Sequence, residues 1–100
     1  LPEEQIYLSV FVPAYNEGGN IPTLLEKLDR TLQAIALPAE VVIVNDGSTD
    51  NTGDLLNAAR AKYPWLQVIT LRRNLGLTEA MRTGFRQVRG QVIVFILTRA

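Results

Sequence analysis

The sequence contains no cysteine and no histidine. The missing cysteine excludes a disulfide framework and thiolate chemistry, and without either residue the usual zinc ligands are absent, so a metal site would need oxygen ligands. The longest uninterrupted apolar run, Val92–Leu97, is far shorter than the roughly 20 residues of a membrane-spanning helix. Residues 1–4 do not form a signal peptide. We therefore expect a cytoplasmic protein.

The length and the apolar content are those of one globular domain. The chain has 100 residues, of which 47% are hydrophobic, so a core can be buried. The net charge is zero, but residues 1–54 carry nine of the ten carboxylates and two of the ten cations. Two solvated faces that attract each other explain this distribution, and so does a basic half that faces phosphates or another anionic partner.

Four short β-branched segments alternate with three segments of helical periodicity. The predicted strands lie at 6–12, 41–44, 68–71 and 92–97, and the predicted helices run from 21 to about 37, over 55–63 and over 77–88. We expect the first strand to end where Pro13 follows it. Long crossovers between strands require a parallel sheet with right-handed connections. The sequence therefore predicts an α/β fold, a three-layer α/β/α arrangement with a mostly parallel sheet.

Polar and backbone-shaping residues follow the first two predicted strands, in "FVPAYNEGGN" and "VNDGSTDNT". In an open parallel sheet the loops at the carboxyl ends of the strands form a crevice that binds ligands. Tyr15 is suited to stack on a flat ring, and Glu17 and Asp46 to accept hydrogen bonds from ring amides or ribose hydroxyls. The structural alternative is that Asp46 is a turn former, as are the neighbouring asparagines, and that Asn20 and Asp50 are helix caps.

Four segments in order and in spacing resemble the family 2 glycosyltransferases, inverting enzymes of the GT-A fold that include dolichyl-phosphate mannose and polyprenyl-phosphate glucose synthases. These segments are "VPAYNEGGNI", "VIVNDGSTDNT", "RRNLGLTEAMRTGF" and "RGQVIVF". The sequence has neither a G-x-G-x-x-G motif nor a Walker lysine motif, so competing nucleotide folds are not supported. The resemblance implies the nucleotide-binding half of a GT-A fold.

The resemblance also implies roles for individual residues. Pro13, Ala14 and Tyr15 would line the pocket for the base and ribose, and Glu17 would lie beside the nucleoside. Asp46 would hydrogen-bond the base or the ribose. Because Asp46 follows a strand at an open crevice, we expect Asp46→Ala to abolish nucleotide binding with little change in stability.

A second group of residues is implied near the sugar or diphosphate of the donor. Asn74 and Gly76 resemble the Asn-x-Gly element that follows the third strand of the family. Arg73 and the amides that open the third helix would add positive potential there.

The reaction that the resemblance implies is displacement of a nucleoside diphosphate, of UDP or GDP type, from a sugar by a lipid phosphate or a glycan. A Mg²⁺ or Mn²⁺ ion, normally held by a D-x-D pair after the fourth strand, offsets the charge on the leaving group. Here Leu97-Thr98-Arg99 replaces that pair, so no metal ligand is assigned. Three explanations remain for the replacement: a fragment with foreign final residues, a lost reading frame and a non-catalytic paralogue. We favour a truncated or altered end. Arg99 pairing directly with the diphosphate is a further alternative.

Family members need about twice this length, so we expect residues 1–100 to be one N-terminal donor-binding domain and a fragment of a longer chain. No catalytic base is assigned, since Glu79 suits the dipole of the third helix. The longer protein would work in the cytoplasm, at the cytoplasmic face of a membrane if its acceptor is a lipid. The competing hypothesis is a non-catalytic interaction module of the same fold, with self-association through the exposed fourth strand. No nucleic-acid partner is expected.

The third predicted helix carries two further features. Arg82, Arg86 and Arg89 form a stripe that is typical of a solvated helix face; contact with anionic lipid or with a missing second half is the alternative. Gly84 interrupts the helix at a cost of about 1 kcal/mol relative to alanine. We expect it to permit close packing on the sheet.

Overall fold

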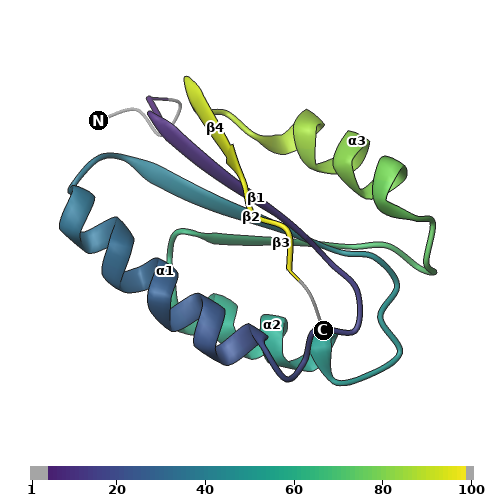
Figure 1. Cartoon of the computed structure of the whole chain (residues 1–100). Helices are drawn as coiled ribbons and strands as arrows, with labels where there is room; N and C mark the ends of the chain where they lie inside the picture. Colours follow the sequence, from purple (N-terminus) through teal and green to yellow (C-terminus); the bar gives the residue numbers. More distant parts are fainter. Residues whose placement is uncertain (1–4, 99–100) are drawn as a thin grey trace.

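Strands and helices alternate along the whole described part of the chain (Figure 1). The structure is a computed structural model that describes residues 5–98. Its elements are β1 (Leu8–Ala14), α1 (Ile21–Ile35), β2 (Ala39–Asn45), α2 (Thr52–Lys62), β3 (Leu66–Thr70), α3 (Leu77–Gln87) and β4 (Val92–Phe95).

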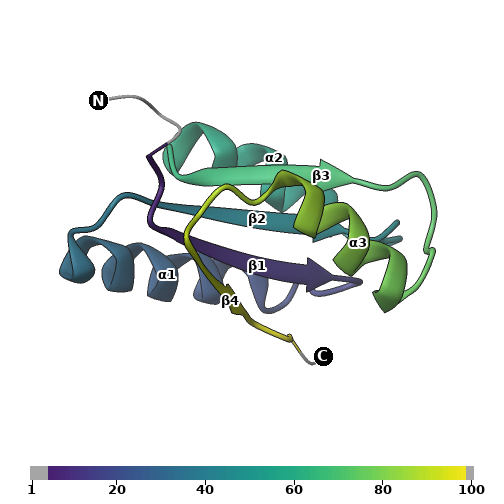
Figure 2. The ribbon, with the colours of Figure 1, turned by 90° about the horizontal axis from the view of Figure 1, so that it is seen from above.

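The four strands form one parallel sheet in the order β3-β2-β1-β4, which Figure 2 shows from above. Helices α1 and α2 lie against one face of the sheet and α3 lies against the other, so the molecule has three layers (Figure 1). The α/β prediction is therefore confirmed. Because the chain passes outward from β1 to β3 and then returns to β4, the strand order reverses between β1 and β4. A crevice at the carboxyl ends is expected at this position.

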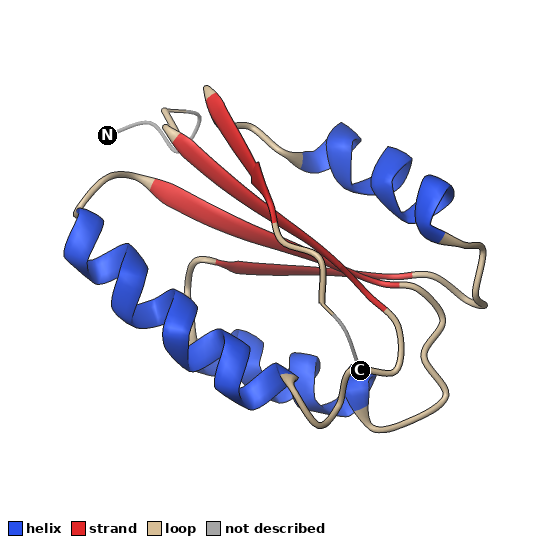
Figure 3. Cartoon of the chain, in the orientation of Figure 1, coloured by secondary structure: helices blue, strands red, loops and turns tan. Residues whose placement is uncertain are grey.

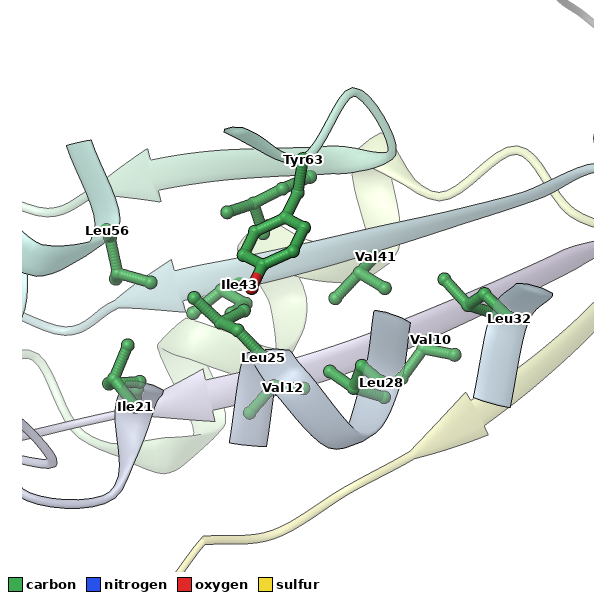
Figure 4. Close-up of a cluster of buried hydrophobic side chains, with 12 residues drawn as sticks. Val10, Val12, Ile21, Leu25, Leu28, Leu32, Val41, Ile43, Leu56 and Tyr63 are labelled. Carbon is green, nitrogen blue, oxygen red and sulfur yellow. The ribbon is translucent and has the colours of Figure 1, made fainter. Parts of the chain in front are cut away.

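The main hydrophobic core lies between the sheet and the pair α1 and α2. Figure 4 shows side chains of α1, among them Leu25 and Leu28, opposite Val12 of β1 and Ile43 of β2. Val12 and Ile43 are completely buried. Side chains alternate across a strand, so the same strands turn their other residues toward α3. The apolar side chains of α1 and the β-branched side chains of β1 and β2 thus pack together in one layer.

The layer under α3 is thinner and is built around Phe11, which is completely buried. A Cβ atom on Gly84 would lie 2.1 Å from Cε1 of Phe11, so the expectation of close packing on the sheet is confirmed. The Phe11 ring also contacts Phe85 and Phe95, with ring centroids 6.0 and 5.2 Å away. Aromatic packing therefore holds α3 against β1 and β4.

A buried carboxylate anchors the connection between α3 and β4. Glu40 of β2 is 2% exposed, and its Oε2 accepts hydrogen bonds from Ser9 Oγ at 2.6 Å and from Arg89 N at 2.7 Å. Its Oε1 accepts from Gln67 Nε2 at 2.8 Å and forms an ion pair with Arg89 Nη2 at 3.1 Å. The prediction that Arg89 belongs to a solvated helix stripe is therefore wrong. Since α3 ends at Gln87, Arg89 lies past the helix and reaches Glu40.

Figure 3 shows the helices, strands and loops of the structure by colour. The observed element bounds differ from the predicted ones at several ends, and the clearest case is Pro13. We predicted that β1 ends before Pro13, but the strand continues to Ala14. Ala14 O accepts from Asp46 N on the β2 side, and Phe11 O accepts from Ile96 N on the β4 side. Because successive residues of a strand bond to alternate sides, the missing amide of Pro13 faces the β4 side. Pairing with β4 ends at Phe11, so no ladder bond is lost.

Strand β4 is the exposed edge of the sheet. Its four residues, Val92 to Phe95, are each about 40% exposed. In the described range 5–98, no helix has the length and apolar character needed to cross a membrane.

Candidate functional site

A cleft of about 450 Å³ opens at the carboxyl ends of the strands, beside the position where the strand order reverses. Loops after β1, β2 and β3, the start of α3 and the end of β4 contribute to it. Its lining residues are Pro13, Ala14, Tyr15, Glu17, Asp46, Asn74, Gly76, Leu77, Ala80, Leu97 and Thr98.

Every residue predicted for nucleotide binding lies in this cleft, although the three contributing loops are far apart in the sequence. The predicted residues differ in exposure. Tyr15 is 43% exposed, whereas Glu17 and Asp46 are 5% and 4% exposed. The cleft therefore combines an accessible aromatic ring with buried carboxylates, which suits a planar ligand that carries hydrogen-bond donors.

Asn16 joins the loop after β1 to the loop after β2. Its backbone is left-handed, with φ of 52°, a conformation that asparagine tolerates better than most residues. The side-chain Oδ1 accepts hydrogen bonds from Thr49 N at 2.8 Å and Asp50 N at 3.2 Å, and Asn16 N donates to Ser48 Oγ at 2.9 Å. Asn16 thereby positions Tyr15 and Glu17 on either side of it, a role that goes beyond that of a local turn former.

The same two loops meet again at Asp50, which we predicted as a cap of the second helix. The residue before α2 is Asn51, and it forms no side-chain cap bond. Asp50 Oδ1 nevertheless accepts from Thr52 N at 2.9 Å, while Oδ2 accepts from Gly18 N at 3.1 Å. The hydrogen bonds from the Thr52 hydroxyl and amide lower the pKa of Asp50 below its ordinary value. Asp50 thus bonds to the first turn of α2 and ties it to the cleft loop.

Asn20 occupies the N-cap position of α1, as the structural alternative expected, but its side chain does not provide the expected cap. It precedes Ile21 but forms no side-chain cap bond. Instead Asn20 Nδ2 donates to Oε1 of Glu17 at 2.8 Å, and Glu17 N donates to Thr52 Oγ1 at 3.0 Å. These bonds hold the Glu17 carboxylate in the floor of the cleft.

Asp46 organises the loop that precedes α3. Its Oδ1 accepts from Leu75 N at 2.9 Å, and its Oδ2 accepts from Gly76 N at 3.1 Å and from Asn74 Nδ2 at 3.3 Å. The premise that Asp46 is a turn carboxylate outside the core is therefore wrong. We now expect Asp46→Ala to reduce stability, because it leaves amides of the Asn74–Gly76 loop without their acceptor.

Gly47 lets this loop approach β2 closely. It has φ of +67°, and a Cβ atom would lie 2.1 Å from the carbonyl carbon of Arg73 and 2.3 Å from Asn74 N. The backbone of Arg73 is thus packed behind the cleft. Arg73 does not line the cleft, so its predicted contribution there receives no support from direct contact.

Sequence reasoning missed the apolar wall of the cleft. Leu77 and Ala80 occupy the first turn of α3, and Leu97 and Thr98 follow β4. The helical spacing of Leu77 and Ala80 was visible in the sequence. This spacing could not distinguish a residue that faces the cleft from one that faces the core, because α3 contributes residues to both.

The expected divalent cation can be tested against the side chains present. Leu97 and Thr98 stand where the first acid and the spacer of the D-x-D pair are expected, and Arg99 lies outside the described residues. Within residues 5–98, no group of three or more acidic, histidine or cysteine side chains is arranged to hold a metal. In the same range every buried side-chain nitrogen or oxygen has a hydrogen-bond partner. The described side chains therefore do not fit the acidic pair of the family and do not form a metal site by themselves.

Comparison with known proteins gives a family match over almost the whole chain. The family model described as Glycosyl transferase family 2 matches residues 9–96. Among curated proteins, the undecaprenyl-phosphate 4-deoxy-4-formamido-L-arabinose transferase of Serratia proteamaculans is 40% identical over 89 residues, 87% of this chain and 27% of the relative. The protein of the same name from Pseudomonas syringae is 37% identical over 88% of this chain and 26% of its own length. The chain thus spans about a quarter of these relatives.

Solved structures give the same assignment of fold. S. aureus TarS 1–349 in complex with UDP superposes with a TM-score of 0.76 and 31% identity, over 92% of this chain and 27% of that one. A mannosyltransferase from Pyrobaculum calidifontis, in complex with GDP-Man and Mn²⁺, gives 0.73 and 27% identity, over 93% and 27%.

Proposed function

The chain belongs to the family 2 glycosyltransferases, a family of transferase enzymes, and from this premise we propose that its cleft binds the nucleotide of a nucleoside diphosphate sugar. One observation carries the proposal. Residues from three loops, predicted separately from the sequence, line one cleft at the point where the strand order reverses. UDP and GDP sugars are both candidates, because similar structures hold UDP or GDP-Man.

Each part of the nucleoside has a matching feature in the proposed complex. The exposed ring of Tyr15 stacks on the base, and Pro13 and Ala14 form the adjoining wall. The buried carboxylates of Glu17 and Asp46 accept hydrogen bonds from the base or the ribose. Asn74 and Gly76 also line the cleft, and in the proposed complex they lie toward the sugar and diphosphate. Asp46 bonds to both residues, so the part of the cleft proposed for the nucleoside is coupled to the part proposed for the diphosphate.

We propose sugar transfer for a protein as long as the relatives. For the residues of this chain, taken as one N-terminal domain, we propose donor binding. The proposed reaction is an inverting displacement of the nucleoside diphosphate by an acceptor. The names of the relatives favour a polyprenyl phosphate acceptor over a glycan. Because such an acceptor is a membrane lipid, the proposed place of the reaction is the cytoplasmic face of a membrane.

Tyr15 provides the sharpest test, because it lines the cleft and is exposed. Tyr15→Ala removes the stacking surface, worth about 1–3 kcal/mol per base, so nucleotide affinity should fall about fivefold or more. Tyr15→Phe keeps the ring and should bind like the wild type. Tyr7, just before the start of β1, is a matched control. Its side chain is as exposed as that of Tyr15, with 42% against 43%. Tyr7→Ala should leave the affinity unchanged.

Calorimetric titration of the chain with UDP and GDP measures these affinities. Equal losses in Tyr15→Ala and Tyr7→Ala would place the nucleotide away from Tyr15. No binding of either nucleotide by the folded wild-type chain would refute donor binding.

The exposed edge of β4 favours a second candidate, a non-catalytic module that associates with another copy of itself. An edge strand has unpaired backbone groups and can template pairing, and here its side chains from Val92 to Phe95 are half-exposed and apolar. Light scattering over a range of concentrations tests this proposal. Val94→Lys should abolish a concentration-dependent dimer, and a monomer at all concentrations would refute self-association.

A further inference from the structure

The end of β4 borders the cleft at the position where the family holds its metal ligands. Ile96 N still bonds to Phe11 O, so the chain leaves the sheet only after Ile96. The next two residues, Leu97 and Thr98, line the cleft, and Leu97 is 63% exposed. Leucine has no metal-binding atom, and a threonine hydroxyl is a neutral ligand. This edge of the cleft therefore offers no carboxylate within the described residues.

Two carboxylates do line the cleft, and each already accepts hydrogen bonds from the chain. Glu17 accepts from Asn20 Nδ2, and the two oxygens of Asp46 accept from Leu75 N and Gly76 N. A cation that took Asp46 as a ligand would compete with these two amides, and an amide that lost its bond would be left without an acceptor. In nucleotide sites Mg²⁺ keeps several waters and is usually bound by one or two carboxylates together with the phosphates of the substrate. Here both carboxylates of the cleft bond to the chain, and within the described residues neither Leu97 nor Thr98 supplies another.

We propose that this chain recognises the nucleoside of its donor without a divalent cation and gains little from the diphosphate. The inference rests on the proposed function of the same cleft. Two carboxylates in the cleft repel a diphosphate, and in the family a cation would offset that repulsion. Without the cation, the contacts to the base and the ribose carry the affinity. UDP should then bind no more tightly than uridine, with or without manganese.

The test is calorimetric titration of the whole chain with uridine, UDP, guanosine and GDP, first in EDTA and then with Mn²⁺. We expect the affinities of the preferred nucleoside and of its diphosphate to differ by less than about threefold in all conditions. Tightening of the diphosphate by about tenfold or more with Mn²⁺ would overturn this inference alone. A diphosphate that binds about tenfold better than its nucleoside in EDTA would also overturn it, since groups of the chain would then hold the phosphates. Failure of every nucleoside and nucleotide to bind would overturn the proposed function as well.

A gain-of-function variant identifies the residues responsible. Leu97→Asp combined with Arg99→Asp restores the family's acidic pair, and the exposure of Leu97 means that the first change removes little buried surface. This variant should bind UDP about tenfold or more tightly with Mn²⁺ than in EDTA, while uridine remains unaffected. The matched control, Leu97→Asn with Arg99→Asn, changes the same positions without adding carboxylates and should show no manganese effect. A manganese effect in both variants, or in neither, would show that positions 97 and 99 do not decide cation binding.

Discussion

Two Glu–Arg ion pairs in this protein have the same N···O distance of 3.1 Å but differ in burial. In the pair on the sheet, the side chain of Glu40 is 3% exposed and that of Arg89 is 43% exposed. In the pair on α3, Glu79 is 44% exposed and Arg82 is 57% exposed. Glu40→Gln and Glu79→Gln are therefore matched substitutions that separate the effect of burial from the effect of distance.

The surroundings of Glu40 set the expected cost of its substitution. Both carboxylate oxygens accept, one from Ser9 Oγ and Arg89 N, the other from Gln67 Nε2 and the Arg89 guanidinium. A glutamine has the same shape but places an NH₂ group against one of these sets of donors. At least one buried donor is then left without an acceptor, at a cost of about 1–3 kcal/mol.

The lost charge adds to this cost. Removing one partner of a fully buried ion pair costs about 3–5 kcal/mol, but water reaches the exposed side of Arg89 and reduces the figure. We expect Glu40→Gln to lower the free energy of unfolding by about 2–4 kcal/mol, a large part of the roughly 5–15 kcal/mol that stabilises a typical domain. Exposed pairs contribute about 0.2–1 kcal/mol, so Glu79→Gln should cost less than about 1 kcal/mol.

Urea denaturation followed by tryptophan fluorescence measures both losses. Trp65 is the only tryptophan, and its ring stacks on Tyr63 with centroids 4.9 Å apart, so its emission reports on the core. Added salt should reduce the small effect at Glu79 more than the effect at Glu40. Equal losses for the two variants, or a loss below about 1 kcal/mol for Glu40→Gln, would refute the claim that burial decides the strength of these pairs.

Three other predictions concern the packing and the loops. Gly84→Ala should lower the free energy of unfolding, measured in urea, by about 1–3 kcal/mol, because the added Cβ would meet the Phe11 ring. Gly19 has open space around it, so Gly19→Ala should not lower the free energy of unfolding. Equal effects of the two substitutions would refute the packing argument. Asn16→Gly should be about 1 kcal/mol more stable than Asn16→Ala, because only alanine is strained at positive φ; the reverse order would contradict this reasoning. The folded-state pKa of Asp50 is lowered from 3.8, first by the Thr52 hydroxyl, so its contribution to stability is present above that pH and is lost as pH falls through the lowered pKa. Carbon-13 NMR titration should give Asp50 a midpoint below 3.8 in the wild type and a higher midpoint in Thr52→Val than in Thr52→Ser; an unchanged midpoint would refute the role of the hydroxyl.

The prediction of the fold succeeded where the physical cause was local. The period of α1 and the β-branched runs of β1 and β2 follow from nearby side chains. The prediction for Pro13 failed because the side of β1 to which its missing amide points depends on β4, about 80 residues later.

The sequence also predicted where the cleft lies and which residues line it, but not how those residues are bonded. Polar loops at the carboxyl ends of parallel strands must meet at one edge of the sheet, so Tyr15, Asp46 and Gly76 were brought together as expected. The hydrogen-bond partners of the cleft residues could not be predicted. Asn16 bonds to Thr49 across 33 residues, and Asp46 to Leu75 across 29.

The sequence by itself determined the order of elements, the parallel sheet and the edge where the candidate site lies, because periodicity and loop chemistry act over a few residues. It also determined that Leu97 and Thr98 provide no carboxylate beside the cleft. Only the tertiary structure decided that Asp46 shapes a neighbouring loop and that Arg89 pairs with Glu40. The partner of a polar side chain depends on which distant backbone the fold brings within hydrogen-bonding distance.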